Sequence, residues 1–519
     1  MLRGYAVPAV RAAEARAMAS LPEGGLMQRA ARGLARVVAE RARDRGAHRV
    51  VVLAGPGDNG GDALWAAALL AVGQADGRAH HHEPGLDHEP DLDHEPDLDL
   101  VVIGATPTLH PVGRAAAERA GVPVLVAGDS PQADIDAALG RAEIVVDGLL
   151  GIGGNPGLRP PMAGLVAAVP GTAYLIAVDL PSGADPEGLV PTPSDRAVAA
   201  DETVTFGMLK PVHLLPAGRS AVGRLRLVDI GVPMEAAPVV ERLEPADVAA
   251  LWPVPGAEDH KYSRGVVAVV AGSGDYPGAA VLCASAAVEA GAGMVRYLGP
   301  RRAEDLVLAA CPEVVPGEGE AQAVVVGSGV VAQVCDHPDC ADGQAERAWE
   351  VLASDVPAVV DAGALEMIPR RLPRPAPTLL TPHAGEAARL MTALGRPTER
   401  RDVETDPVGS ARWLAATTGC TVLLKGATTL VVDPDPRVPV RAQTDAPAWL
   451  ATAGAGDVLA GVCGVLLAAG LSPRDAGSLG ALVHGRAAEL ANPGGPVRAL
   501  AVARSLSRAV ADLLGKASR

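Results

Sequence analysis

The sequence predicts an α/β protein built from two doubly wound domains. Short apolar runs alternate with alanine-rich helical stretches along most of the chain. Continuous apolar runs of this kind are typical of strands that are buried on both faces of a parallel sheet. The alternation stops in a proline-rich segment at 232–259 and then starts again, so we predict a first domain over 1–235 and a second over 240–519.

The first domain opens with a helical pattern over 10–43 that is broken by proline and glycine at 21–25. A second helical pattern, over 61–72, follows the first apolar run. The second domain contains a long apolar helical stretch at 457–470. Strands are predicted at 49–54, 100–103, 122–126, 143–147, 174–179, 203–206 and 224–230 in the first domain, and at 265–271, 323–327, 357–361, 377–380 and 420–432 in the second.

Composition and charge argue against several classes of function. Of 519 residues, 49% are hydrophobic, which is ample for buried cores, while five Trp, five Tyr and one Phe are too few for stacking platforms on single-stranded nucleic acid. The formal charge of −16 argues against binding to nucleic acid or to anionic membranes. No apolar run approaches the ~18 residues of a membrane span, and the start of the chain has no signal-peptide pattern. We therefore expect a cytoplasmic protein, and we expect it to form a homo-oligomer.

Two polar tracts contain residue types that bind metals. An acidic hexamer is repeated three times over 82–99, and its low apolar content favours a solvated, disordered insertion over a weak metal site. Residues 335–340 read Cys-Asp-His-Pro-Asp-Cys and offer three zinc ligands, but no second pair stands at zinc spacing, which favours a surface loop.

Glycine-rich or charged segments in the first domain come directly after predicted strands. The first, at 54–62, reads A-G-P-G-D-N-G-G-D and can hold a phosphate at the start of a helix, although this motif alone favours a tight turn capped by Asn59 or Asp62. Three more segments each place a carboxylate or a lysine at the end of an apolar run: 145–154, 177–183 and 203–211. Oxygens from Asn59, Asp147 and Ser182 could together hold a hard cation.

In this order the motifs resemble the NAD(P)H-hydrate epimerase domain over roughly residues 1–235; they read A-G-P-G-D-N-G-G-D, V-D-G-L-L-G-I-G, V-D-L-P-S-G and T-V-T-F-G-M-L-K-P. The resemblance implies a Rossmann-like fold and a K⁺ site formed by Asn59, Asp147 and Ser182. It also implies that Asp179 is the acid/base residue of epimerisation, for which a turn-capping role is the alternative. The residues implied to line the hydrated dinucleotide are Asp58, Asn59, Gly60, Gly61, Asp62, Gly151, Ile152, Gly153, Gly154, Asn155, Pro156, Gly157 and Asp179.

The second domain carries its own motifs at strand ends. G-S-G-D-Y-P-G at 272–278 separates a predicted strand from a helix, and T-P-H-A-G-E at 381–386 follows another strand. Lys425 and Gly426 supply a cation and an accessible backbone at the next strand end, as a nucleotide phosphate requires. The segment 454–457, Gly-Ala-Gly-Asp, opens an apolar helix, so backbone N–H donors gather beside a carboxylate. This arrangement suits phosphoryl transfer, and a simple helix cap is the alternative.

With L-L-K-G-A-T-T and A-T-A-G-A-G-D-V-L-A-G, this order of motifs resembles the ADP-dependent NAD(P)H-hydrate dehydratase, a ribokinase-like enzyme, over roughly 240–519. The resemblance implies that Asp457 is the catalytic base and that Mg²⁺ bridges the phosphates of ADP. The implied nucleotide-binding residues are Lys425, Gly426, Ala427, Thr428, Thr429 and Gly456. The residues implied to contact the hydrated substrate are Ala279, Gly329, His383 and Asp457. The chain departs from the family pattern after Asp361, where a second acidic residue is replaced.

The order of the two domains resembles the bacterial bifunctional NAD(P)H-hydrate repair enzymes. We therefore expect NADHX, NADPHX and ADP as ligands, and no nucleic-acid or membrane partner. The first domain would interconvert R and S hydrates, with Lys210 as a candidate partner of Asp179. The second would dehydrate the S form and release AMP and phosphate. Two alternatives are a second domain that phosphorylates a small alcohol, and a first domain that binds dinucleotides without catalysis.

Deletion of residues 83–97 tests the interpretation of the acidic repeat. We expect the activity at saturating substrate and the melting temperature to change little, because such a repeat can bury hardly any apolar surface. Activity assays, thermal melts and elemental analysis of the deleted and full chains measure this. A halved activity or the loss of a bound metal would contradict the interpretation.

Overall fold

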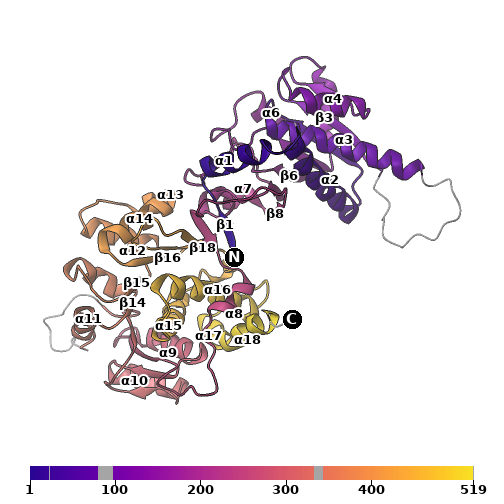
Figure 1. The fold of residues 1–519 in the computed structure, drawn as a ribbon. Coiled ribbons are helices and arrows are strands. Elements are labelled where there is room, and N and C mark those ends of the chain that lie inside the picture. The colour runs from indigo at the N-terminus through magenta and orange to yellow at the C-terminus, as the bar shows by residue number, and fades with distance from the viewer. Residues whose placement is uncertain (23, 80–96, 332–342, 518–519) are drawn as a thin grey trace, which may run out of the picture. The chain divides into compact units, whose positions relative to one another are not determined.

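The computed structural model describes residues 1–22, 24–79, 97–331 and 343–517 (Figure 1). Most of the acidic repeat and the Cys-Asp-His-Pro-Asp-Cys segment lie outside the described residues. The chain separates into two compact units, Arg3–Pro238, here called the N-terminal unit, and Val239–Arg519 with Met1–Leu2, here called the C-terminal unit. The first two residues, which the sequence analysis assigned to the first domain, thus group with the second.

The N-terminal unit contains a parallel sheet in the order β4-β3-β2-β5-β6-β7-β8. Its strands are β2 (Arg49–Ala54), β3 (Asp99–Gly104), β4 (Val124–Val126), β5 (Ile144–Gly148), β6 (Tyr174–Val178), β7 (Glu202–Phe206) and β8 (Arg224–Val228). Its helices are α1 (Val7–Met18), α2 (Gly25–Arg45), α3 (Asp58–Ala79), α4 (Pro111–Arg119), α5 (Gln132–Gly140), α6 (Met162–Ala167), η2 (Pro211–His213), η3 (Pro216–Gly218) and α7 (Arg219–Val222).

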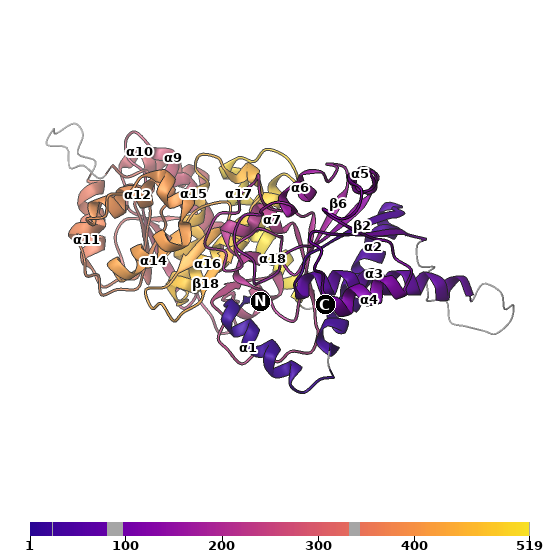
Figure 2. The same cartoon turned by 90° about the horizontal axis from the view of Figure 1, so that it is seen from above.

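Helices cover both faces of this sheet. Val50 and Val52 belong to a core cluster with α2 and α3, whereas Val51 and Leu53 belong to another with α5 and α6. Because successive side chains of a strand point to opposite faces, the wholly apolar β2 needs both layers. Figure 2 shows these helix pairs on opposite sides of β2 and β6. Every strand predicted in this half is present, and the prediction of a doubly wound sheet is confirmed.

The strand order of the N-terminal unit reverses between β2 and β5, which are paired neighbours. The chain runs from β2 outward to β3 and β4, and then returns to build β5 to β8 on the other side. The loops after β2 and β5 therefore diverge and leave a crevice at their carboxyl ends, where open α/β sheets bind ligands.

The sheet of the C-terminal unit has the order β1-β9-β18-β17-β16-β15-β14-β13-β10-β11-β12, and of its edge strand β1 only Leu2 belongs to this unit. Its strands are β1 (Leu2–Gly4), β9 (Val240–Arg242), β10 (Val266–Val270), β11 (Met294–Tyr297), β12 (Val315–Pro316), β13 (Ala323–Val326), β14 (Ala358–Val360), β15 (Thr378–Leu380), β16 (Thr421–Leu424), β17 (Thr429–Val432) and β18 (Val440–Gln443). Its helices are α8 (Pro245–Leu251), α9 (Pro277–Glu289), α10 (Arg301–Ala310), α11 (Gln344–Ala353), η4 (Ala362–Arg370), α12 (Ala384–Ala393), α13 (Arg400–Thr405), α14 (Pro407–Thr418), η5 (Ala448–Leu450), α15 (Ala455–Ala468), α16 (Pro473–Ala491), α17 (Ala499–Arg504) and α18 (Leu506–Ala517).

The strands from β12 to β16 in this order are parallel, whereas β16, β17 and β18 pair antiparallel. The apolar run predicted at 420–432 as one strand is thus a hairpin, with a turn at Lys425–Thr428 between β16 and β17. The short strands β9, β11, β12 and β18 carry charged residues or prolines and were not predicted. Within the described ranges, no helix is long and apolar enough to span a membrane.

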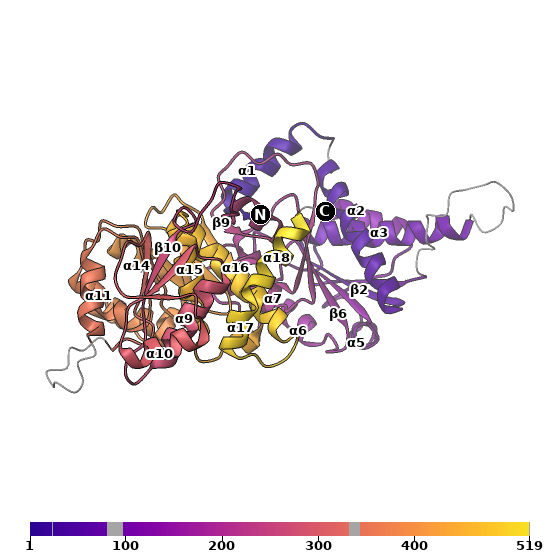
Figure 3. The same ribbon diagram turned by 90° about the horizontal axis from the view of Figure 1, so that it is seen from below.

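Helix α15 lies against the sheet beside β10 (Figure 3), and two of its glycines have no room for a side chain. A Cβ at Gly464 would lie 2.2 Å from Val325 Cγ2 of β13, and one at Gly461 would lie 2.4 Å from the carbonyl oxygen of Cys283 in α9. Both distances are far shorter than van der Waals contact. Glycine is therefore required where this helix crosses β13 and α9, and the helix is held at a fixed depth.

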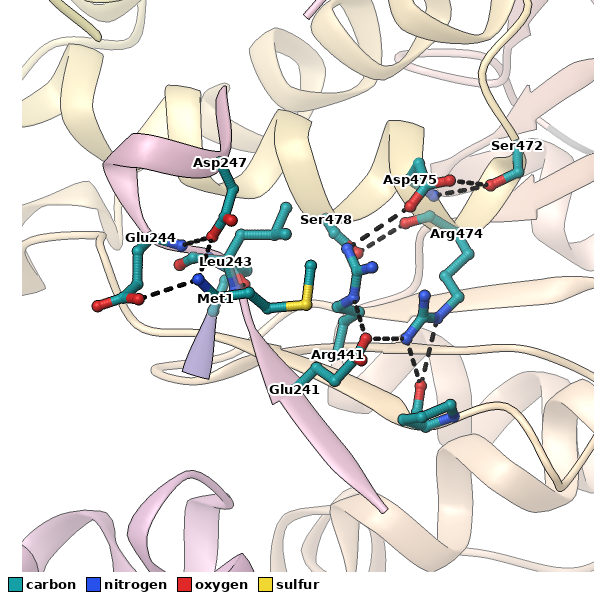
Figure 4. A network of polar contacts seen from close by, with 12 residues as sticks. Met1, Glu241, Leu243, Glu244, Asp247, Arg441, Ser472, Arg474, Asp475 and Ser478 are labelled. Carbon is teal, nitrogen blue, oxygen red and sulfur yellow. Dashed lines mark hydrogen bonds and ion pairs between the residues drawn. The ribbon is translucent and has the colours of Figure 1, made fainter. Parts of the chain in front are cut away.

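A buried ion network joins β9, β18 and α16 (Figure 4). Arg441 Nε and Arg474 Nη2 donate to Glu241 Oε2 at 2.9 and 2.8 Å. Burial raises the pKa of Glu241, but hydrogen bonds from the two guanidinium groups outweigh it, so the pKa is lowered. The network compensates the charges that β9 and β18 bury in the sheet.

Candidate active sites

A cavity of about 1250 Å³ lies in the N-terminal unit, and its walls include residues that follow β2, β5 and β6. Eight of the residues predicted to bind the dinucleotide line it: Asp58, Asn59, Asp62, Gly151, Ile152, Gly153, Gly154 and Asp179. The other predicted residues, Gly60, Gly61, Asn155, Pro156 and Gly157, are not part of this wall. Gly157 instead has a φ of 83° and donates its N–H to the carbonyl of Gly183.

Close backbone contacts shape the glycine-rich turn after β2. A Cβ at Gly55 would lie 1.9 Å from the carbonyl oxygen of Leu149, so only glycine fits where the turn packs against the loop after β5. Helix α3 begins at Asp58, and a Cβ at Gly60 in its first turn would lie 2.1 Å from the carbonyl oxygen of Gly55. This close packing brings the free N–H groups of the helix N-terminus to the cavity wall.

Asp179 is held at the end of β6 by a buried lysine. Lys210 Nζ donates to Asp179 Oδ1 at 2.5 Å, and the side chain of Lys210 is only 1% exposed. Thr205 Oγ1 donates to the same oxygen at 3.0 Å. Asp179 also has a φ of 64°, a left-handed conformation that is costly for a residue with a side chain. Such strain persists only where the surroundings impose it, and it is common at functional sites.

His213 connects the backbones of these two residues. Its Nδ1 accepts the backbone N–H of Lys210 at 3.0 Å, so a neutral ring carries its proton on Nε2, which donates to the carbonyl of Asp179 at 2.8 Å. Burial, together with the nearby Lys210 charge, lowers the pKa of His213 to about 4. The ring is therefore neutral at physiological pH and fixes the strained backbone of Asp179.

The three residues predicted to hold K⁺ lie together beside the cavity. Ser182 Oγ donates to Asp147 Oδ1 at 2.7 Å, and Asn59 Nδ2 donates to the carbonyls of Leu150 and Val178 at 3.0 and 2.9 Å. Asp147 is fully buried, and the hydrogen bonds that it accepts come from neutral groups. Burial raises the pKa of Asp147 to about 6 in spite of these bonds.

Two further carboxylates face the same cavity, Glu14 of α1 and Asp62 of α3. Burial raises the pKa of both, and the charge of Asp179 adds to the effect. Arg11 of α1 also lines the cavity and donates to the carbonyl of Ile152 at 3.0 Å. The sequence analysis predicted a helix here but missed its contribution, because a helical pattern alone does not show which face meets a cavity.

The C-terminal unit gathers its polar residues around Asp361, at the end of β14. Ser328 and Thr381 donate to this carboxylate at 2.9 and 2.8 Å, and Lys425 Nζ donates at 2.8 Å. Asp361 is 2% exposed, and although burial raises its pKa, Lys425 and these hydrogen bonds outweigh burial and lower it. Lys425 also lies 3.5 Å from Glu386 of α12. The sequence analysis noted Asp361 only as a departure from a family pattern.

Asp457 stands in the first turn of α15, beside this cluster. Burial raises the pKa of Asp457 to about 7, and the charge of Asp361 raises it further, while Lys425 and a hydrogen bond from Ser328 oppose the rise. A carboxylate of this kind is poised to accept a proton at neutral pH. A Cβ at Gly456 would lie 3.3 Å from Lys425 Nζ, so the ammonium group reaches the N-terminus of α15.

The predicted nucleotide-binding residues lie in the turn between β16 and β17. Gly426 and Ala427 are exposed, and Thr428 Oγ1 is buried without a hydrogen-bond partner among the described residues. Thr429 begins β17. A buried hydroxyl without a partner costs free energy, which a ligand oxygen could recover.

The predicted contacts to the hydrated substrate lie in the loop after β13 and at the N-terminal ends of α9, α12 and α15. Gly329 lies against α9, since a Cβ there would be 2.6 Å from that of Ala279. His383 caps α12, where its Nδ1 accepts the N–H groups of Gly385 and Glu386 at 3.0 and 3.2 Å. A neutral His383 therefore carries its proton on Nε2, and its half-exposed ring can donate to a ligand.

The family profile described as "NAD(P)H-hydrate dehydratase" matches residues 267–506, and the one described as "YjeF-related protein N-terminus" matches 23–212. A "Bifunctional NAD(P)H-hydrate repair enzyme Nnr" of Mycobacterium leprae is 42% identical over 94% of both chains. This chain belongs to that family.

Another repair enzyme of the family, from Corynebacterium glutamicum, is 34% identical over 81% of this chain and 78% of its own. A solved structure described as ADP/ATP-dependent NAD(P)H-hydrate dehydratase from Bacillus subtilis, co-crystallised with ATP and Mg²⁺, covers 52% of this chain and 97% of its own, at 26% identity and a TM-score of 0.46. The expected resemblance to bifunctional NAD(P)H-hydrate repair enzymes is confirmed, as is the expected pair of Rossmann-like and ribokinase-like domains.

The stability of this repair enzyme should fall on acidification because of His213. Its pKa is about 4 in the folded chain against about 6.5 when unfolded, so the unfolded chain binds more protons below pH 6.5. Its contribution is complete above pH 6.5 and is lost as the pH falls towards 4. Between pH 7 and 4.5 the free energy of unfolding should fall by roughly 2–3 kcal/mol more than in His213→Gln.

Urea denaturation at both pH values measures the difference. The exposed His48→Gln variant is the control and should keep the wild-type pH dependence. Equal pH dependence in the His213 variant and the wild type would show that the ring is not buried in its neutral form.

Proposed function

We propose that this protein repairs hydrated NADH and NADPH, with epimerisation of NADHX and NADPHX in the N-terminal unit and ADP-dependent dehydration of the S form in the C-terminal unit. Its support is 42% identity, over 94% of the chain, to a relative named as a bifunctional NAD(P)H-hydrate repair enzyme. Each unit also has a carboxylate at the carboxyl edge of a doubly wound sheet, next to a lysine. We propose further that the protein is a cytoplasmic homo-oligomer.

Asp179 is the proposed acid/base residue of epimerisation. Hydration of the nicotinamide ring leaves a hydroxyl-bearing carbon next to the ring nitrogen, and exchange of its configuration requires proton transfer at that hydroxyl. Lys210 and Thr205 fix one carboxylate oxygen of Asp179, which leaves the other to face the cavity and the substrate. The N-terminus of α3 would bind a phosphate of the dinucleotide.

Asn59, Asp147 and Ser182 are proposed to hold K⁺. The fit rests on Asp147, a fully buried carboxylate whose charge the neutral groups around it do not compensate. The carbonyl of Leu150, which accepts from both Asn59 and Ser182, adds an oxygen at the same place. Oxygen donors of this kind suit a hard cation. The ion would supply a fixed positive charge beside the cavity.

Asp457 is the proposed base of the dehydratase. It would take the proton from the substrate hydroxyl as that oxygen attacks the β-phosphorus of ADP, with release of AMP. Loss of phosphate with the proton from the adjacent carbon then restores the double bond of NADH or NADPH. The N–H groups of α15 and Lys425 would stabilise the charge on the phosphoryl oxygens.

Nucleotide binding is proposed for Lys425, Gly426, Ala427, Thr428, Thr429 and Gly456, and contact with the hydrate for Ala279, Gly329, His383 and Asp457. Mg²⁺ is proposed to enter with ADP, since this ion keeps phosphate and water ligands in nucleotide sites. In the described ranges, no three His, Cys, Asp or Glu residues are grouped to hold a metal ion. The alternative of a kinase for a small alcohol differs in its product, because a phosphorylated alcohol would accumulate without recovery of reduced nicotinamide.

Asp457→Asn should abolish dehydration and leave folding and ADP binding largely intact. An amide cannot accept the proton, and a positioned base contributes on the order of 10² to 10⁴ in rate. In the wild type, the rate should rise with pH to half its plateau near the pKa of about 7, because Asp457 must be ionised to act. Reduced-nicotinamide absorbance with ADP measures both. Activity within a few-fold of wild type would show that Asp457 is not the base of dehydration.

Asp179→Ala should still repair the separated S hydrate at a near-normal rate with ADP. The R hydrate should be consumed only as fast as it epimerises spontaneously, because no acid/base residue remains to exchange its configuration. Added wild-type N-terminal activity, supplied by Asp457→Asn protein, is the rescue control. Rapid R-hydrate repair by the mutant alone would show that epimerisation does not depend on Asp179, which would favour a turn-capping role for this residue.

K⁺ should raise the melting temperature of the wild type above that in Na⁺ or Li⁺ at equal ionic strength, because an ion that binds only the folded chain stabilises it. Asp147→Asn should abolish the difference. A scan of each variant in the three chlorides measures it. If the Asp147 variant kept the full K⁺ effect, K⁺ would bind at a site other than the one proposed here.

A further inference from the structure

Ser328 occupies a buried position between two carboxylates of the C-terminal unit. Its side chain follows β13 and is fully buried. Its hydroxyl donates to Asp361 Oδ2 at 2.9 Å, and hydrogen bonding from the same side chain lowers the pKa of Asp457. One hydroxyl, with a single proton, therefore lies within reach of both the proposed base and the buried anion beside it.

The groups around Asp457 come from several elements and have opposing effects. Asp361 after β14 and Glu386 of α12 are like charges that disfavour its ionised form. Lys425 after β16 is the cation that opposes them, and Asp361 holds it at 2.8 Å. Cys283 of α9, a buried thiol, also lies within the electrostatic reach of Asp457.

We propose that Ser328 and Asp361 are positioning residues for the proposed base Asp457: the Ser328 hydroxyl is shared between the two carboxylates, and Asp361 anchors Lys425 beside both. The inference rests on the proposed dehydratase function. Without the shared donor, two carboxylates would face each other in a site from which water is largely excluded, and Asp457 would retain its proton at neutral pH.

The arrangement also explains how the site accommodates the reaction. When Asp457 takes a proton from the substrate, it needs the hydroxyl of Ser328 less as a donor. The hydroxyl can then donate fully to Asp361, to which it is already aligned. The hydroxyl can change its acceptor by rotation about its own bond, without movement of the backbone.

Ser328→Ala tests the shared donor through the pH profile of dehydration. Loss of the hydrogen bond should raise the pKa of Asp457 by about one unit, which lowers the rate at pH 7 by about fivefold and leaves the plateau above pH 9 near that of wild type. Ser328→Thr, which keeps the hydroxyl, should restore the wild-type profile. Ser478→Ala is the matched control, since Ser478 is equally buried but donates to the carbonyl of Arg474 in α16.

Asp361→Asn should move the same midpoint in the opposite direction, to lower pH, because the like charge is removed. General damage to the fold would not shift the two profiles in opposite directions. An unchanged midpoint in Ser328→Ala, or a fall in rate that is the same at every pH, would overturn the inference. A wild type without ADP-dependent dehydration would instead refute the proposed function, so the two failures are distinguishable.

Discussion

A lysine that is paired with a carboxylate at the end of a parallel strand organises each of the two sites, and one partner of each pair is buried. Lys210 pairs with Asp179 after β6, and Lys425 pairs with Asp361 after β14. A lone charge in either place would cost several kcal/mol, so each partner requires the other. The chain has only four lysines, and two of them serve in this way. Arginine is plentiful but carries a broad planar head, whereas a compact ammonium fits between a strand end and a loop.

The two pairs differ in what they do for the proposed proton-transfer residue. Lys210 binds Asp179 itself, and this carboxylate is therefore held in place by a direct ion pair. Lys425 binds Asp361 instead, and the pKa of the neighbouring Asp457 rises to about 7 because burial and the charge of Asp361 outweigh the charge of Lys425. The same residue types thus produce two electrostatic environments, and the difference follows from which carboxylate receives the lysine.

Local patterns in the sequence were sufficient for the strands and for much of the sites. Runs such as 143–147 and 174–179 end in Asp147 and Asp179, and parallel strands bring such ends to one edge, so residues in and beside the cavity could be predicted to lie together. Contacts that depend on the direction of a side chain could not be predicted in this way. Glu14 reaches the cavity only because of how α1 crosses it, and Ser328 is recognisable only through its distance to Asp361. Asn155 to Gly157 were expected in the cavity wall, but the left-handed turn at Gly157 directs that loop towards Gly183.

The glycines of α15 link the position of Asp457 to packing outside the site. Gly464 sits on β13 with no room for a methyl group, and it is seven residues from Asp457 on the same rigid helix, about 10 Å along the axis. The contact between Gly464 and β13 therefore fixes how close the helix lies to the sheet, and with it the position of Asp457 relative to Asp361. A side chain at position 464 would push the helix away from the sheet. A substitution in the core would then change the proton affinity of Asp457 at the N-terminus of α15, although residue 464 lies far from the site.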